Sequence, residues 1–184
     1  MIKRKNIIKI AIDSPAAAGA GTLAKAISKH YNLFYLDTGK IYRMIAYLKL
    51  KYPKKFNQSF LKKRIKSLKI KNLLNRALLS DKVGTQASII SKNKDIRKLV
   101  HSFQINFAYN PPRRYKGSCL DGRDITYKII PDADCKFFIN ANLNTRALRR
   151  FKELRALNSL YLLNALVFTL AVIKNLKSAS GIIL

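Results

Sequence analysis

Residues 7–22 read IIKIAIDSPAAAGAGT, and this stretch decides the fold. Its first six residues form an apolar, β-branched run that predicts a buried strand. Residues 13–21 are small and predict a loop, and residues 22–31 have the apolar spacing of a short helix. A strand, a loop of small residues and a helix that opens with Gly-Thr are typical of a phosphate site, because backbone N–H groups and the helix N-terminus supply positive potential.

The rest of the chain alternates strand-like and helical patterns outward from this unit. Further strands are predicted at residues 33–36, 119–120 and 135–139, and further helices at residues 40–51 and 145–157. Residues 54–112 have mainly helical patterns and close with Asn-Pro-Pro. Strands that alternate with helices predict an α/β fold with a mainly parallel, three-layer sheet.

The chain has only nine acidic residues, and four of them sit where a site would form. Asp13 and Asp37 directly follow strand-like runs, and Asp121 and Asp124 lie within one tetrapeptide. Ligands of open α/β sheets bind in the crevice at the carboxyl ends of the strands. The placement of these carboxylates therefore predicts a site at that edge of the sheet.

The formal net charge of +28 leaves two interpretations open. Basic side chains in this number attract any polyanion, which favours binding to RNA or DNA. The alternative is that lysine covers every solvated face. Residues 49–76 hold eleven basic residues and no acid, interleaved with Leu, Ile and Phe at helical spacing. That pattern favours lysine-coated amphipathic helices, and we expect a small anionic substrate and no specific nucleic acid as partner.

Cys119 and Cys135 are the two cysteines, with no CxxC spacing and no crowd of histidines. A disulfide framework or a zinc site is therefore not expected, and a reducing cytoplasm fits. Residues 160–173 form an uncharged run that is shorter than the roughly 20 apolar residues needed to span a bilayer. We expect a buried helix or a weak amphipathic patch there, and no membrane anchor.

The loop resembles the phosphate loop of the cytidylate kinase family, D-G-P-x-[AS]-[SG]-G-K-G-T, although the general pattern G-x-x-x-x-G-K-[ST] is not matched. Two positions depart from the family: Ser14 replaces its first glycine, and Ala20 occupies the position of its lysine. The resemblance implies that Thr22 holds Mg²⁺. It also implies that ATP is bound by the loop residues Ser14, Pro15, Ala16, Ala17, Ala18, Gly19, Ala20, Gly21 and Thr22.

The missing lysine is the more serious departure. A lysine that neutralises phosphoryl charge stabilises the transition state, and the loss of one such group costs roughly 10²–10³ in rate. Either Lys25, one turn into the helix, or a basic residue from another segment could replace it.

Two motifs on the substrate side extend the resemblance. D-T-G-K-I-Y-R at residues 37–43 is similar to the family's D-[ST]-G-x-x-Y-R, which implies that Arg43 binds the acceptor phosphate and Thr38 the base. D-G-R-D at residues 121–124, followed by a P-D-A at residues 131–133, is similar to the family's D-G-R-D. By resemblance, Arg123 would bind the acceptor phosphate and Asp124 would contact the nucleoside. Asp121 would lie near the metal or the transferring group. Taken singly, each motif could instead be a helix cap or a tight turn with a local ion pair.

Two helical segments complete the match. Residues 96–100 with Gln104 resemble the helix that supplies a further phosphate-binding arginine, here Arg97. Residues 145–151 resemble the R-A-x-R-R helix beside the lid, whose arginines, here Arg146, Arg149 and Arg150, face the nucleotide phosphates. Five segments therefore match in family order across residues 7–157.

The resemblance implies a three-layer P-loop NTPase fold with a nucleoside-monophosphate-binding insertion at about residues 54–112. It implies transfer of a phosphoryl group from ATP to CMP or dCMP with Mg²⁺, in pyrimidine nucleotide metabolism, by a cytoplasmic monomer. Three alternatives stay open: another small-molecule kinase of the same fold, a catalytically impaired nucleotide-binding homologue, and a basic nucleic-acid-binding protein.

The resemblance stops after about Leu157, where residues 158–184 form an apolar tail outside the predicted domain, residues 1–157. The family continues with a lid that carries R-D-x-x-D-x-x-R, whereas residues 159–184 contain no Arg, Asp or Glu. The lid is therefore predicted to be incomplete. Our hypothesis is that the family's usual end has been replaced, for instance by a frameshift or a truncated reading frame.

Overall fold

The computed structural model describes residues 7–156, so the apolar tail predicted at residues 158–184 lies outside the described residues. The chain divides into two compact units, Met1–Arg146 and Ala147–Leu184. The helical elements of the first unit are α1 (Ala20–Tyr31), α2 (Gly39–Lys51), η1 (Pro53–Lys55), α3 (Gln58–Lys66), η2 (Ile70–Leu74), η3 (Arg76–Leu79), α4 (Asp81–Ile90), α5 (Lys94–Tyr109) and η4 (Ile125–Ile129). Residues 143–156 are also helical, which confirms a helix close to the predicted one.

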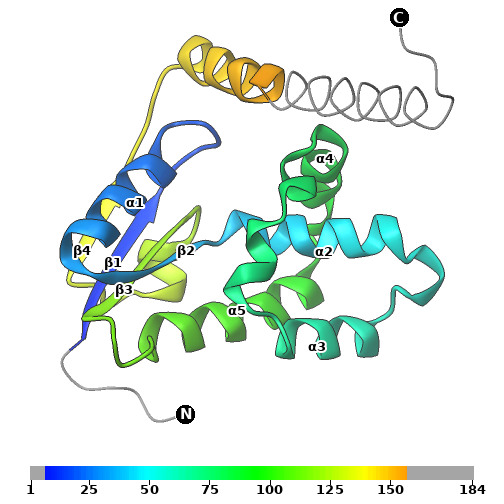
Figure 1. The fold of residues 1–184 in the computed structure, drawn as a ribbon, viewed down its shortest axis with the longest axis horizontal. Helices are drawn as coiled ribbons and strands as arrows, with labels where there is room; N and C mark the ends of the chain where they lie inside the picture. Colours follow the sequence, from blue (N-terminus) through cyan, green and yellow to red (C-terminus); the bar gives the residue numbers. More distant parts are fainter. Residues whose placement is uncertain (1–6, 157–184) are drawn as a thin grey trace, which may run out of the picture. The chain divides into compact units, whose positions relative to one another are not determined.

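The strands of the first unit form one parallel sheet (Figure 1). They are β1 (Ile8–Asp13), β2 (Leu33–Asp37), β3 (Gly117–Gly122) and β4 (Cys135–Phe138), in the spatial order β2-β3-β1-β4. Each of the three pairings is parallel, with Ile12 opposite Asp121 between β1 and β3. The predicted α/β class and parallel sheet are confirmed, and all four strands end at the same edge.

Strand side chains point alternately to the two faces of the sheet, and each face packs against different helices. Ile10, Ile12 and Cys119 pack with Ala20 and Ala24 of α1 on one face. On the other face, a second cluster joins the buried strand residues Ala11, Leu36 and Leu120 to the helices of the insertion. Because strand side chains point to alternate faces, helices on both sides give three layers.

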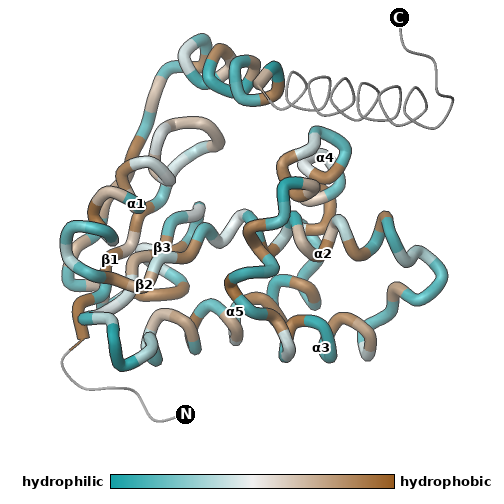
Figure 2. The backbone as a smooth tube through the Cα atoms, viewed as in Figure 1, coloured by the Kyte–Doolittle hydropathy of each residue, from teal (hydrophilic) through white to brown (hydrophobic). Residues whose placement is uncertain are grey.

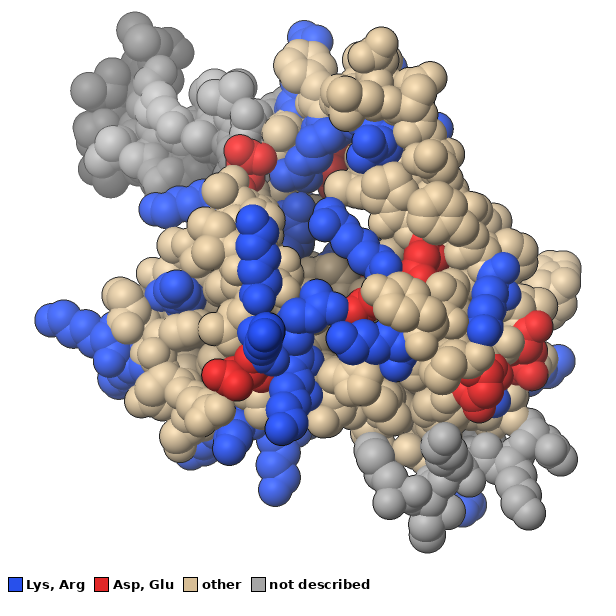
Figure 3. All heavy atoms as spheres, turned by 180° about the vertical axis from the view of Figure 1, so that it is seen from behind, with Lys and Arg blue, Asp and Glu red and all other residues tan. Residues whose placement is uncertain are grey.

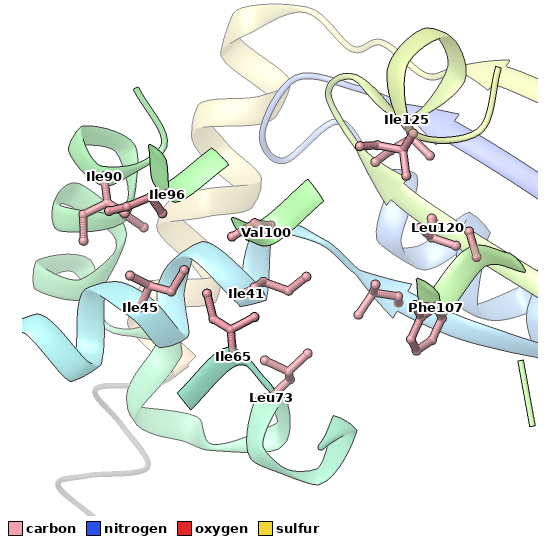
Figure 4. Packing of buried hydrophobic residues seen from close by; sticks show 14 of the residues in the cluster. Ile41, Ile45, Ile65, Leu73, Ile90, Ile96, Val100, Phe107, Leu120 and Ile125 are labelled. Atoms are coloured by element: carbon pink, nitrogen blue, oxygen red, sulfur yellow. The ribbon is translucent and has the colours of Figure 1, made fainter. Parts of the chain in front are cut away.

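The insertion is helical, as predicted, and has its own share of the core. Ile41 and Ile45 of α2 point toward Ile96 and Val100 of α5 in Figure 4. All four side chains are buried, and the two in each helix are four residues apart, which places them on one side of that helix. The second cluster is therefore continuous from the sheet into the insertion.

The lysine-rich helices have the predicted amphipathic character. In α3, Leu61 and Ile65 are buried while Lys62, Lys63 and Lys66 are exposed. Figure 2 shows the same mixture of hydrophilic and hydrophobic segments along the insertion. On the face drawn in Figure 3, lysine and arginine side chains outnumber the acidic ones. The basic residues of α3 therefore coat a folded surface.

Candidate functional site

The phosphate loop connects β1 to α1 and depends on backbone conformation. Gly19 caps α1 with φ 106°, in the left-handed region that favours glycine, and Ala17 also has a positive φ of 61°. The N–H groups of Thr22 and Leu23 both donate to the Gly19 carbonyl, at 3.1 and 3.2 Å. Within residues 7–156, the N–H groups of Ala20 and Gly21 have no acceptor, as expected for the first turn of a helix. The loop therefore presents donors and the positive end of the α1 dipole.

Ala20, which stands where the family has its lysine, is buried at the start of α1. Its side chain packs in the apolar cluster with Ile10 and Ile12. This position therefore adds no positive charge to the loop. Lys25, one turn further along, is exposed, and its charge acts on Asp121.

Asp13 holds the end of β1 to the segment after β3. Its carboxylate accepts the N–H groups of Ile125 at 2.8 Å and Thr126 at 3.0 Å, and also the Thr126 hydroxyl at 2.5 Å. The N–H of Ser14 donates to the Gly122 carbonyl at 2.9 Å. Asp13 is thus a structural carboxylate that ties the phosphate loop to the D-G-R-D segment.

Asp121 lies beneath the first turn of α1. A Cβ atom built on Gly21 would be 3.4 Å from Asp121 Oδ2, so glycine lets the helix and the carboxylate approach. Asp121 Oδ1 and the Tyr35 hydroxyl are both buried without a hydrogen-bond partner. Burial and then the nearby Asp37 carboxylate raise the pKa of Asp121 to about 7, while the charge of Lys25 acts in the opposite direction. An orphaned carboxylate oxygen at a phosphate loop is suited to a cation or an ordered water.

Thr38 joins the ends of β2 and β3. Its N–H and hydroxyl both donate to the Asp121 carbonyl, at 3.1 and 2.8 Å. Gly122 is required beside it, because a Cβ atom there would be 2.4 Å from Thr38 Oγ1. The hydroxyl proton of this buried residue is engaged within the protein, and contact between Thr38 and a base stays a prediction.

Arg43 crosses from α2 to the segment that contains η3 and α4. Its Nη1 donates to the Leu78 carbonyl at 2.8 Å, and its guanidinium would lie 3.2 Å from a Cβ atom built on Gly84. The guanidinium of Arg43 is therefore held by the insertion. Its predicted role in binding an acceptor phosphate is compatible with this position and stays a prediction.

Arg97 and Asp124 meet, as the motifs suggested, in a cavity of about 270 Å³. Arg97 Nη2 forms an ion pair with Asp124 Oδ2, and its Nη1 donates to the Ser91 carbonyl at 3.4 Å. The cavity lies among α2, α5 and η4 and is lined by Tyr42, Lys94, Arg97, Lys98, His101, Gln104, Asp124, Lys128 and Ile129. Burial raises the pKa of the Tyr42 hydroxyl, against the charge of Arg97.

The remaining predicted arginines are Arg123, Arg146, Arg149 and Arg150. Arg123 is exposed and has no hydrogen bond or ion pair within residues 7–156. Arg146 Nε donates to the Ala141 carbonyl at 3.1 Å. Arg149 and Arg150 belong to the second unit, where Arg150 forms an ion pair with Glu153 at 2.8 Å. The site roles of these four arginines stay predictions.

Sequence reasoning assigned no role to several residues of the cavity, including Tyr42, His101 and Gln104. A signal for Gln104 was available. It is a polar residue on a helix face otherwise formed by apolar residues at helical spacing, such as Val100 and Phe107.

Residues 10–172 match the family model described as cytidylate kinase. The chain belongs to the cytidylate kinase family. The matched range continues past Leu157, so the boundary predicted at that residue stays a prediction.

Curated cytidylate kinases resemble the chain over most of its length. The protein from Bartonella tribocorum is 48% identical over 149 residues, which cover 79% of this chain and 66% of the relative. The protein from Bartonella bacilliformis is 42% identical over 151 residues, or 81% of this chain and 68% of the relative. The protein from Rhodopseudomonas palustris is 42% identical over 145 residues, which cover 78% of this chain and 66% of the relative. The matched part spans about two thirds of the length of these relatives.

No helix within residues 7–156 has both the length and the apolar composition that crossing a membrane requires.

Proposed function

We propose that this chain transfers the γ-phosphoryl group of ATP to CMP or dCMP. The observation that carries the proposal is the meeting of three motif segments at the carboxyl edge of the sheet. Ser14 of the phosphate loop bonds to Gly122, and Thr38 bonds to Asp121. An edge of this kind is where α/β proteins bind ligands, and here it brings a donor-rich loop close to an arginine–carboxylate cavity.

On the ATP side, the loop residues 14–22 would hold the phosphates through backbone N–H groups and the α1 dipole. Mg²⁺ accompanies ATP in this proposal and would neutralise phosphate charge when bound. The exposed Thr22 hydroxyl and the orphaned Asp121 carboxylate oxygen are ligand types that suit Mg²⁺, which binds through few protein groups together with substrate phosphates.

On the acceptor side, Arg43, Arg97 and Arg123 would bind the phosphate of CMP, with Thr38 and Asp124 near the nucleoside. Arginine suits this task because its planar fork donates to two phosphate oxygens at once. Within this proposal, Arg97 exchanges part of its bond to Asp124 for the substrate.

In the reaction, a phosphate oxygen of CMP attacks the γ-phosphorus of ATP. The bond between that phosphorus and the β–γ bridging oxygen breaks, and ADP leaves with the electron pair. Such transfer needs mainly alignment and neutralisation of charge, so no general base is invoked. Arg123 would neutralise the transferring group, and Arg146, Arg149 and Arg150 would act from the lid side.

The absence of a lysine at Ala20 favours one second candidate, a homologue that binds nucleotides but turns over slowly. Backbone donors alone can hold phosphates, whereas the transition state loses roughly 10²–10³ in rate without such a cation. We propose Lys25 as the replacement because it is exposed on α1 and its charge reaches Asp121.

The proposal includes a cytoplasmic monomer. Cys119 is buried and Cys135 exposed, and both are free thiols in the structure, which is compatible with a reducing compartment.

The test is ADP release by the purified chain with MgATP and each of CMP, dCMP, UMP and AMP as acceptor, run beside Ala20→Lys. We expect turnover with CMP and dCMP, and faster turnover by the variant. Binding of CMP without turnover by either protein would favour the impaired homologue. Salt-sensitive RNA binding that CMP does not compete would favour the nucleic-acid alternative.

A further inference from the structure

Tyr35 of β2 carries a buried hydroxyl in an apolar part of the protein. Its ring packs against the cluster beneath α1, which includes Ala24 and Cys119. Within residues 7–156, the hydroxyl has no hydrogen-bond partner. A buried hydroxyl without a partner costs free energy, so proteins rarely keep one without a reason. The apolar cluster alone therefore does not account for a tyrosine at this position.

The register of the sheet brings Tyr35 close to Asp121. Between β2 and β3, Tyr35 lies opposite Cys119, and Asp37 lies opposite Asp121. Because strand side chains alternate, Tyr35 and Asp121 share one face of the sheet as diagonal neighbours, which an aromatic side chain can span. A Cβ atom built on Gly21 would be 3.5 Å from the Tyr35 hydroxyl oxygen and 3.4 Å from Asp121 Oδ2. Both oxygens therefore lie beneath the same point of the phosphate loop.

The two groups are complementary as donor and acceptor. Burial raises the pKa of the Tyr35 hydroxyl, and the negative charges of Asp121 and Asp37 raise it further. The hydroxyl therefore keeps its proton and is a donor at neutral pH. An ionised carboxylate only accepts hydrogen bonds. Asp121 Oδ2 lies on the Tyr35 side at Gly21, whereas Oδ1 is the buried oxygen without a partner in the described part of the chain.

We propose that Tyr35 is a positioning residue: its hydroxyl donates to Asp121 Oδ2 and orients the carboxylate so that Oδ1 meets the cation that accompanies ATP. The inference rests on the proposed function for the identity of the cation and the nucleotide. It adds the residue that holds their carboxylate in place. Carboxylates that bind a metal are commonly held by an outer hydrogen bond of this kind, and its loss costs about 10–100-fold in metal affinity.

Tyr35→Phe tests the proposal because it removes the hydroxyl and keeps the ring. The measurement is calorimetric binding of ATP to the full chain without an acceptor, once with excess Mg²⁺ and once with EDTA. Mg²⁺ should tighten the binding of ATP to the unsubstituted chain. In Tyr35→Phe the ratio of the metal-free to the Mg²⁺ dissociation constant should fall about tenfold, with metal-free binding unchanged. A merely structural role of the hydroxyl would instead weaken binding under both conditions.

A matched control and a double substitution sharpen the test. Tyr31→Phe should leave the ratio unchanged, because Tyr31 is 52% exposed at the end of α1, where its ring contacts His30. If Tyr35 acts through Asp121, Tyr35→Phe should have no further effect on the ratio in an Asp121→Ala background. Thermal melting checks that each variant folds. An unchanged ratio in folded Tyr35→Phe would overturn the proposal, and so would equal effects of Tyr35→Phe in the two backgrounds.

Failure of this inference is distinguishable from failure of the proposed kinase function. If Tyr35→Phe loses the effect of Mg²⁺ while the unsubstituted chain shows no turnover of CMP, the positioning role stands and the kinase proposal fails. If turnover is normal and the ratio is the same in Tyr35→Phe, the positioning role alone fails. If Mg²⁺ does not tighten the binding of ATP to the unsubstituted chain, the positioning role is overturned whatever the turnover.

Discussion

The phosphate loop and the acceptor cavity of this protein are constructed in different ways. The loop depends on backbone: Gly19 in the left-handed region, unmatched N–H groups at Ala20 and Gly21, and the α1 dipole. The cavity depends on side chains, among them the ion pair of Arg97 and Asp124. A site made of backbone can keep its shape when one side chain is lost, whereas a site made of paired charges cannot. The two regions should therefore respond very differently to substitution.

The largest expected effect is on the cavity. Arg97→Met leaves the half-buried Asp124 carboxylate without its partner, so kcat/KM for CMP should fall about 10³-fold while the affinity for ATP changes little. Steady-state kinetics with each substrate varied in turn provide the measurement. The exposed Arg113→Met is the control and should leave kcat/KM unchanged. An equal loss of ATP affinity in Arg97→Met would show that the two regions are not separable.

The next effect is a gain at the loop. Ala20→Lys restores the cation, and kcat should rise about 10²-fold with little change in the KM for CMP. The same substitution in a Lys25→Gln background tests whether Lys25 replaces the missing loop lysine in the unsubstituted chain. If Lys25 does so, Ala20→Lys should raise kcat more in the Lys25→Gln background than in the unsubstituted chain. Identical gains in both backgrounds would rule out Lys25 as the replacement.

A smaller effect is expected where the two regions join. Thr38→Val removes the hydroxyl that donates to the Asp121 carbonyl, so the free energy of unfolding should fall by about 1 kcal/mol. Urea denaturation measures the change. Thr38→Ser keeps the hydroxyl and should retain most of that hydrogen bond. A loss in Thr38→Ser equal to that in Thr38→Val would assign the effect to packing instead.

The last expected effect is a pH dependence of stability. The pKa of Asp121 is raised from 3.8 to about 7 in the folded protein, so the folded state holds this proton more tightly than the unfolded state. The protonated carboxyl contributes its full stability below pH 3.8, the ordinary pKa of an aspartate. This contribution is lost as the pH rises toward about 7, the pKa of Asp121 in the folded protein. Asp121→Asn should remove this loss in magnesium-free buffer.

Melting temperatures between pH 4 and pH 8 measure this difference. The control Asp95→Asn changes an exposed acid at the start of α5 and should keep the slope of the unsubstituted chain. A slope in Asp121→Asn that matches the unsubstituted chain would assign the dependence to other groups.

Much of the fold could be predicted because local patterns and final structure agree. β1, β2 and α2 lie within one residue of their predicted bounds, since each has an apolar spacing that matches its period. α1 begins at Ala20, two residues earlier than predicted, because Gly19 in the left-handed region caps the helix there.

Other elements could not be predicted because distant residues decide them. The π-helical η4 follows D-G-R-D, and its first two N–H groups donate to Asp13, which is far away in sequence. β3 extends from Gly117, where a Cβ atom would be 1.9 Å from the Ile8 carbonyl oxygen, and this close approach depends on pairing with β1.

The site shows the same division. Motifs predicted that Arg97 and Asp124 belong to one site, and the structure brings them together. They could not predict that the Thr38 proton would be engaged by Asp121, or that the amide of Gln104 would line the cavity, because both depend on packing between segments.

The central claim is that one cleft holds two phosphorylated ligands face to face. The most direct measurement is the binding of adenosine and cytidine joined through a 5′,5′-pentaphosphate, compared with ATP and CMP separately. We expect one joined ligand per chain, bound at least about tenfold more tightly than ATP and displaced by either single nucleotide, since linked ligands gain effective concentration. A joined ligand that binds no more tightly than ATP and is not displaced by CMP would contradict the account.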